Sequence, residues 1–191
     1  NHLRKLLIKF PNTIKLVIDV RGNGQPLPSL LDEIWEHKNE NGELIEYPPL
    51  VPDDDEERKK LKGAIPLIRK VAATNTTNNS MYTYLKASFE NKSLRLLINS
   101  AEIDHLYKQD EINAEEYSSF VNTDLLIQEL SNIRQSETNS GNTTYERISK
   151  TTKRDRVTSL AYAMDYINEL EQDNKLSLNN NGDYDYNFFF N

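Results

Sequence analysis

The stretch Ile14-Lys-Leu-Val-Ile-Asp-Val-Arg-Gly-Asn-Gly24 decides the fold that this sequence predicts. Its apolar residues are almost uninterrupted and mostly β-branched, which is typical of a strand covered on both faces in an α/β sheet. Asp19 comes near the end of the run, where a lone charge is costly unless it is paired or binds a cation. Gly22 and Gly24 allow a tight turn and a close approach to a ligand. Because ligands bind outside the carboxyl ends of strands in open α/β sheets, we expect a site near Asp19.

A second informative stretch, Lys153-Arg-Asp-Arg-Val-Thr-Ser-Leu160, opens a helical pattern that predicts a helix from Asp155 to Glu171. The apolar residues expected on its buried face are Val157, Leu160, Ala161, Met164, Ile167 and Leu170. Asp155 lies off that face in the first turn, where the helix dipole favours a carboxylate. A role as a capping acid and a role as a metal ligand are therefore both open for Asp155.

The two stretches resemble two motifs of one known family. Residues 18–27 are similar to the second acidic strand in the nuclease domain of phage terminase large subunits. Residues 153–162 resemble the Lys-Asp-Arg-x-x-Ser-Leu signature that opens the last helix of that domain. The resemblance covers roughly residues 1–172. It implies an α/β, ribonuclease H-like fold, incomplete at the N-terminus, with helices packed on a mixed sheet. Residues 173–191 are expected to form a flexible tail, rich in Asn and aromatic residues.

This resemblance implies a metal-dependent DNA endonuclease that would cut concatemeric viral DNA in the host bacterial cytoplasm. Asp19 and Asp155 would be the second and third catalytic acids and the ligands of Mg²⁺ or Mn²⁺ in a two-metal site, since hard cations prefer carboxylate oxygens. The basic residues expected to contact DNA phosphates are Arg21, Lys150, Lys153, Arg154 and Arg156. The implied partners are double-stranded DNA, the terminase ATPase region, the small terminase subunit and the portal protein, with no membrane.

The family's first catalytic acid, on the first strand of a three-stranded meander, has no counterpart in this sequence. A separate upstream chain or a longer protein would complete the site, whereas a degenerate remnant would be a non-catalytic DNA- or portal-binding module. A further alternative is an unrelated α/β domain in which Asp19 pairs with a buried Arg or Lys.

The amino-acid composition limits the kinds of fold and site that this chain can have. The 191 residues suffice for one domain with a core, and the absence of cysteine excludes disulfides and thiolate metal sites. The net charge of −7 means that DNA contact has to come from a local basic patch. No apolar run approaches transmembrane length, and no signal-peptide pattern is present at the N-terminus.

The remaining patterns predict helices at 2–10, 28–38, 79–90 and 113–134, the last with a break at 122–124, and strands at 64–71, 94–98 and 145–149. The connections 39–63 and 135–144 are expected to be polar, and the tail is expected to be disordered to about residue 182. We interpret Trp35 as a core anchor, His105 as a surface residue and the acidic run 53–57 as a solvated loop.

Overall fold

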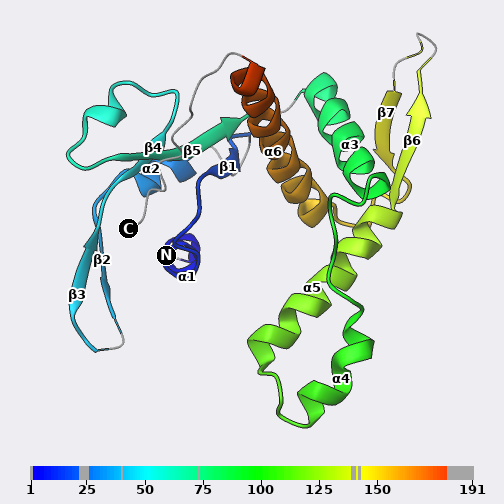
Figure 1. Cartoon of the computed structure of the whole chain (residues 1–191), viewed down its shortest axis with the longest axis horizontal. Helices are drawn as coiled ribbons and strands as arrows, with labels where there is room; N and C mark the ends of the chain where they lie inside the picture. Colours follow the sequence, from blue (N-terminus) through cyan, green and yellow to red (C-terminus); the bar gives the residue numbers. More distant parts are fainter. Residues whose placement is uncertain are drawn as a thin grey trace. The chain divides into compact units, whose positions relative to one another are not determined.

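The computed structural model describes residues 2–21, 26–39, 41–72, 74–138, 141 and 143–179 (Figure 1). In this part of the chain it is an α/β protein in which helices accompany three small sheets. The chain divides into two compact units, one made of residues 1–73 and 174–191 and the other of residues 74–173. The predicted α/β class is confirmed.

The first unit contains a parallel sheet of three strands in the order β1-β5-β4. The strands are β1 (Leu16–Asp19), β4 (Leu50–Pro52) and β5 (Ile65–Val71). Asp19 is the last residue of β1 and lies opposite Val71 in the register, so the predicted position of Asp19 at a carboxyl end is confirmed. Among the described residues this sheet is purely parallel, whereas the resemblance implied a mixed sheet.

The core of the first unit forms around β5, because the central strand of a parallel sheet is covered on both faces. Leu67 and Ile68 are fully buried there. Leu7 of α1 (His2–Lys9) and Leu31 of α2 (Leu27–Leu31) join this core, as do Ile18 and Leu50. The predicted helix at 2–10 and the predicted strand at 64–71 are confirmed.

The helix predicted at 28–38 is wrong in its second half. The segment β2 (Trp35–Lys38) pairs antiparallel with β3 (Leu44–Tyr47), and Gly42 takes a positive φ of 80° in the connecting turn. The apolar residues 30, 31, 34 and 35 match helical spacing, but cross-strand pairing decides the structure here. Trp35 lies opposite Tyr47 with ring centroids 5.1 Å apart and is only partly buried, so it is no simple core anchor.

The connection 39–63, predicted to be polar and without regular structure, also contains the buried strand β4 and a short 3-10 helix at Arg58–Lys60. A three-residue strand beside prolines is too short to show periodicity, and its place at the edge of the sheet tolerates proline. The acidic run is paired along its length, as the ion pairs show: Asp53 with Lys15, Asp54 with Lys70, Asp55 with Arg58, Glu56 with Lys59 and Glu57 with Lys60.

The second unit is built mainly from helices α3 (Asn75–Glu90), α4 (Ser100–Lys108), α5 (Ala114–Ser131) and most of α6 (Asp155–Asn179). Helix α3 begins before the predicted residue 79 because Thr74 and Thr77 form a capping box. Helix α4 was not predicted, and His105 on it is exposed as expected. No strand forms at 94–98, since this stretch has no strand partner among the described residues.

Helix α5 runs without the predicted break at 122–124. Asp124 explains the difference, because its carboxylate accepts the N–H of Ser100, the first residue of α4, at 3.1 Å, while Asn99 is the N-cap of that helix. Tyr117 of α5 stacks on Tyr107 of α4 with ring centroids 4.5 Å apart. The polar residues in the middle of α5 therefore serve tertiary contacts and do not end the helix.

A hairpin of β6 (Ile133–Glu137) and β7 (Thr143–Arg147) follows α5, where the sequence predicted a loop at 135–144 and a strand at 145–149. Tyr145 of β7 stacks on Tyr82 of α3 with ring centroids 5.6 Å apart. The hairpin is thereby attached to α3.

Helix α6 buries Val157, Ala161 and Met164 as predicted, although Ile167 is 41% exposed. The helix continues to Asn179, so residues 172–179 are helical and not part of a disordered tail. The rest of the tail, residues 180–191, lies outside the described residues. Within the described part of the chain, no helix combines the length and the apolar character needed to cross a membrane.

Candidate functional site

The first candidate site surrounds the N-terminal end of α6 in the second unit. Asp155 is the first residue of the helix and is exposed. Its backbone carbonyl accepts the hydroxyl of Ser159 at 2.9 Å, while its carboxylate makes no hydrogen bond or ion pair with the described residues. The carboxylate is therefore available to a ligand.

Glu129 of α5 caps the N-terminal end of α6, a role for which Asp155 was one candidate from the sequence. Its Oε2 accepts the N–H groups of Arg156 and Val157 at 2.9 and 3.2 Å. The first N–H groups of a helix have no partner within the helix, and a carboxylate is well suited to accept them. Since Glu129 does this, Asp155 is not required as the cap of α6.

The same glutamate holds the side chain of Arg156. Its Oε1 lies 2.9 Å from Nη1 of Arg156, and Nη2 of Arg156 donates to Oδ1 of Asn122 at 3.2 Å. Glu129 is 4% exposed, so this is a buried charge that is compensated by a cation and two backbone donors. Arg156 has a structural role in joining α5 to α6, and its predicted contact with DNA stays a prediction.

An open groove of about 670 Å³ lies along this end of α6. Its lining comes from α5 and from the start of α6: Asn122, Thr123, Leu126, Lys153, Asp155, Arg156 and Ser159. The structure thus brings together three of the predicted site residues, Lys153, Asp155 and Arg156. Lys150 and Arg154 are exposed in the segment before α6 but do not line the groove.

The second candidate site is the carboxyl edge of the parallel sheet in the first unit. Asp19 is partly buried, and its Oδ1 accepts the N–H of Arg21 at 2.9 Å. Arg21 is exposed and donates from Nη2 to the carbonyl of Ala72 at 3.2 Å. The predicted glycine turn at 22–25 lies outside the described residues.

Sequence reasoning missed a cleft of about 280 Å³ at this edge, with the following lining: Val20, Pro28, Ser29, Pro52, Asp55, Arg58 and Lys70. Arg58 is held by Asp32 at 3.2 Å and by Asp55 at 3.4 Å. The charged stretch 53–60 was the feature of the sequence that could have indicated this cleft. Only the folded sheet, however, brings that stretch beside Lys70 and Val20.

Asp19 belongs to the first unit and Asp155 to the second, so their meeting around a shared ion stays a prediction. Carboxylate oxygens are suitable donors for Mg²⁺ or Mn²⁺. Within the described residues, however, no three His, Asp or Glu side chains converge as a set of metal ligands. Each aspartate is therefore a suitable ligand for a divalent cation, but neither forms a complete metal site by itself.

Comparisons with models of protein families, with curated proteins and with solved structures found no match for this chain.

Proposed function

We propose that this chain is the C-terminal part of a metal-dependent DNA endonuclease of a viral packaging terminase, with a ribonuclease H-like fold, acting in the host bacterial cytoplasm. The main support for the proposal is the environment of the Asp155 carboxylate. Its exposed carboxylate lines an open groove beside Lys153, while Glu129 caps the helix. An acid that is not required for capping and that faces a groove next to a cation suits a catalytic role better than a structural one.

The position of Asp19 supports the same assignment. It ends a strand of a parallel sheet, at the edge where α/β sheets bind their ligands. In the proposed enzyme Asp19 and Asp155 together hold Mg²⁺ or Mn²⁺. When bound, such ions activate the attacking water and stabilise the charge on the leaving oxygen of a phosphodiester.

The protein's own cations would position the DNA. Lys153 lines the groove of Asp155, and Lys150 and Arg154 are exposed just before the helix. Arg21 adds a cation beside Asp19. Contacts of these side chains with phosphates are independent of sequence and weaken with salt. By the same proposal the partners are double-stranded DNA, the ATPase region, the small terminase subunit and the portal protein.

The experiment that tests the proposal measures nicking of supercoiled plasmid with Mn²⁺ by the chain with and without the upstream segment that supplies the first acid. With that segment we expect nicking by the wild type, none by Asp155→Asn or Asp19→Asn, and unchanged nicking by Glu146→Gln as the matched control on an exposed strand. Mn²⁺ titration calorimetry should show heat that is lost in Asp19→Asn. Nicking that persists in both aspartate variants would refute the assignment.

A second candidate is a module that binds DNA or the portal without cutting. The exposed cations Lys150, Lys153 and Arg154 favour it, because contact with phosphates requires no metal ion. Fluorescence anisotropy with labelled duplex DNA in EDTA distinguishes the two. Salt-sensitive binding together with no nicking in Mn²⁺ would favour the binding module.

A further inference from the structure

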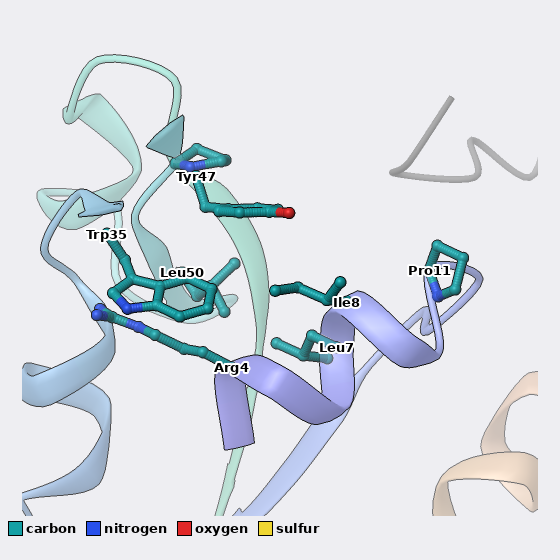
Figure 2. Close-up of a pocket in the computed structure, with 8 residues that line it drawn as sticks. Arg4, Leu7, Ile8, Pro11, Trp35, Tyr47 and Leu50 are labelled. Carbon is teal, nitrogen blue, oxygen red and sulfur yellow. The ribbon is translucent and has the colours of Figure 1, made fainter. Parts of the chain in front are cut away.

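The first unit contains an apolar cavity of about 160 Å³ that the proposed nuclease does not use. Helix α1 and the hairpin β2–β3 provide most of its lining: Arg4, Leu7, Ile8, Pro11, Trp35, Tyr47, Pro48 and Leu50. Figure 2 shows Leu7 and Ile8 of α1 on one side of the cavity and Trp35 and Tyr47 on the other. A cavity of about 150 Å³ lined by apolar side chains is known to accept benzene, so this one has room for a single aromatic ring.

The aromatic wall of the cavity is held in place before any ligand arrives. Trp35 stacks on His37 with ring centroids 5.3 Å apart, and the guanidinium of Arg4 lies 5.6 Å from the centre of the Trp35 ring. Nη2 of Arg4 also donates to the carbonyls of Leu30 and Glu33 at 3.1 and 3.0 Å. A preformed wall of this kind lowers the entropic cost of binding.

The chain itself carries a segment with matching chemistry. Residues 180–191 read Asn-Asn-Gly-Asp-Tyr-Asp-Tyr-Asn-Phe-Phe-Phe-Asn, with five aromatic residues, two aspartates and no basic residue. Solvated tails are usually poor in aromatic residues, so this composition indicates a segment that has a binding partner. The charge is complementary as well, because α1 contains Arg4, Lys5 and Lys9 and no acidic residue.

The length of the segment allows the contact. The described chain ends at Asn179, and its last described residues, 174–179, are grouped with the unit that contains the cavity. Phe188–Phe190 follow Asn179 by nine to eleven residues. An extended chain of that length spans about 30 to 36 Å, which is comparable to the diameter of a small unit.

We propose that the aromatic segment 184–190 docks onto the first unit of its own chain and places one phenylalanine ring of Phe188–Phe190 in the cavity beside Trp35. Asp183 and Asp185 then face the basic residues of α1. This contact covers apolar surface that would otherwise be exposed between α1 and the hairpin. It does not depend on the nuclease proposal.

Trp35 is the only tryptophan, so its fluorescence reports on this cavity alone. The test compares the full chain with the variant Phe188→Ser/Phe189→Ser/Phe190→Ser. We expect the variant to show Trp35 emission at longer wavelength and stronger quenching by acrylamide. Added peptide 180–191 should reverse both changes saturably, less well at high salt because the charge contribution is screened. The same peptide with its three phenylalanines replaced by serine should have no effect.

The control variant is Ile148→Ser, which changes an apolar side chain that is 62% exposed in the second unit and should leave Trp35 emission unchanged. Equal emission and quenching in the wild type and the triple variant would overturn the proposal. So would a change that the peptide does not reverse. Light scattering should find that the wild type is a monomer. A wild-type dimer that dissociates on the triple substitution would instead show that the cavity holds the tail of a second copy.

Discussion

The carboxylate of Glu129 and the guanidinium of Arg156 lie 2.9 Å apart and join α5 to α6. The same carboxylate accepts the backbone N–H groups of Arg156 and Val157. Asp124, also on α5, accepts the N–H of Ser100 at the start of α4. The position at which α6 begins, and with it the position of Asp155, is therefore set by a residue on another helix.

Replacing Glu129 by Ala should destabilise the second unit by about 2 kcal/mol, because a buried hydrogen-bonding partner is lost. The side chain of Arg156 is 37% exposed and remains in contact with water, so it adds little to this loss. The two backbone N–H groups of α6 also lose their acceptor. Urea unfolding followed by far-UV circular dichroism measures the change. Hydrogen exchange should show the loss of protection at the start of α6.

The matched control for this substitution is Glu146→Ala. Glu146 pairs with Arg134 at 3.8 Å, and both side chains are about 60% exposed. Exposed pairs of this kind contribute about 1 kcal/mol or less. Equal losses of stability from the two substitutions would contradict the capping role of Glu129.

Asp155→Asn should change stability by about 1 kcal/mol or less, which is the usual contribution of one carboxylate to the helix dipole. Under the proposed function, the same substitution abolishes nicking with Mn²⁺. Thermal unfolding and the plasmid assay on one preparation check both parts. A loss of stability as large as that of Glu129→Ala would instead make Asp155 a structural residue.

Leu67→Ala should destabilise the first unit by about 3 kcal/mol, since truncation of a buried leucine loses transfer free energy and leaves a cavity. Leu67 is fully buried on the central strand, whereas Leu30 is 63% exposed. Leu30→Ala is therefore the control and should have an effect of about 0.5 kcal/mol or less. Hydrogen exchange assigns the change, because increased exchange should appear in β1, β4 and β5.

Tyr84 should make stability depend on pH in the alkaline range. Burial raises the pKa of its hydroxyl, and so does the carboxylate of Glu171, to which the hydroxyl donates at 3.3 Å. A pKa that is higher in the folded state gives stability that is fully present below the unfolded value of about 10 and is lost as the pH rises through the folded value. Urea unfolding between about pH 8 and 11 should show a steeper decline for the wild type than for Tyr84→Phe. Parallel declines would show that Tyr84 has no such role.

Local sequence patterns correctly predicted the helices and strands whose apolar residues recur at regular spacing. The runs at 14–20 and 64–71 form adjacent parallel strands, and the spacing of Val157, Ala161 and Met164 identifies the buried face of α6. Helix α5 begins after Asn113 because the side chains of Asn113 and Glu116 form a capping box, a signal that is visible in the sequence.

The incorrect predictions fall where a distant partner decides the structure. Residues 35–38 match helical spacing but pair with residues 44–47, and strand β4 is too short to be recognised without its neighbour β5. The stretch 94–98 alternates like a strand but has no strand partner among the described residues.

The sequence by itself determined the strand that ends in Asp19, the apolar face of α6 and the cluster of cations before Asp155. It did so because each depends on residues close together in the chain. Only the tertiary structure decided that Glu129 caps α6, that Arg156 is held between two helices and that the carboxylate of Asp155 faces an open groove. The physical reason is that a buried carboxylate takes its partners from whatever element packs against it, and no local pattern in α5 specifies that element.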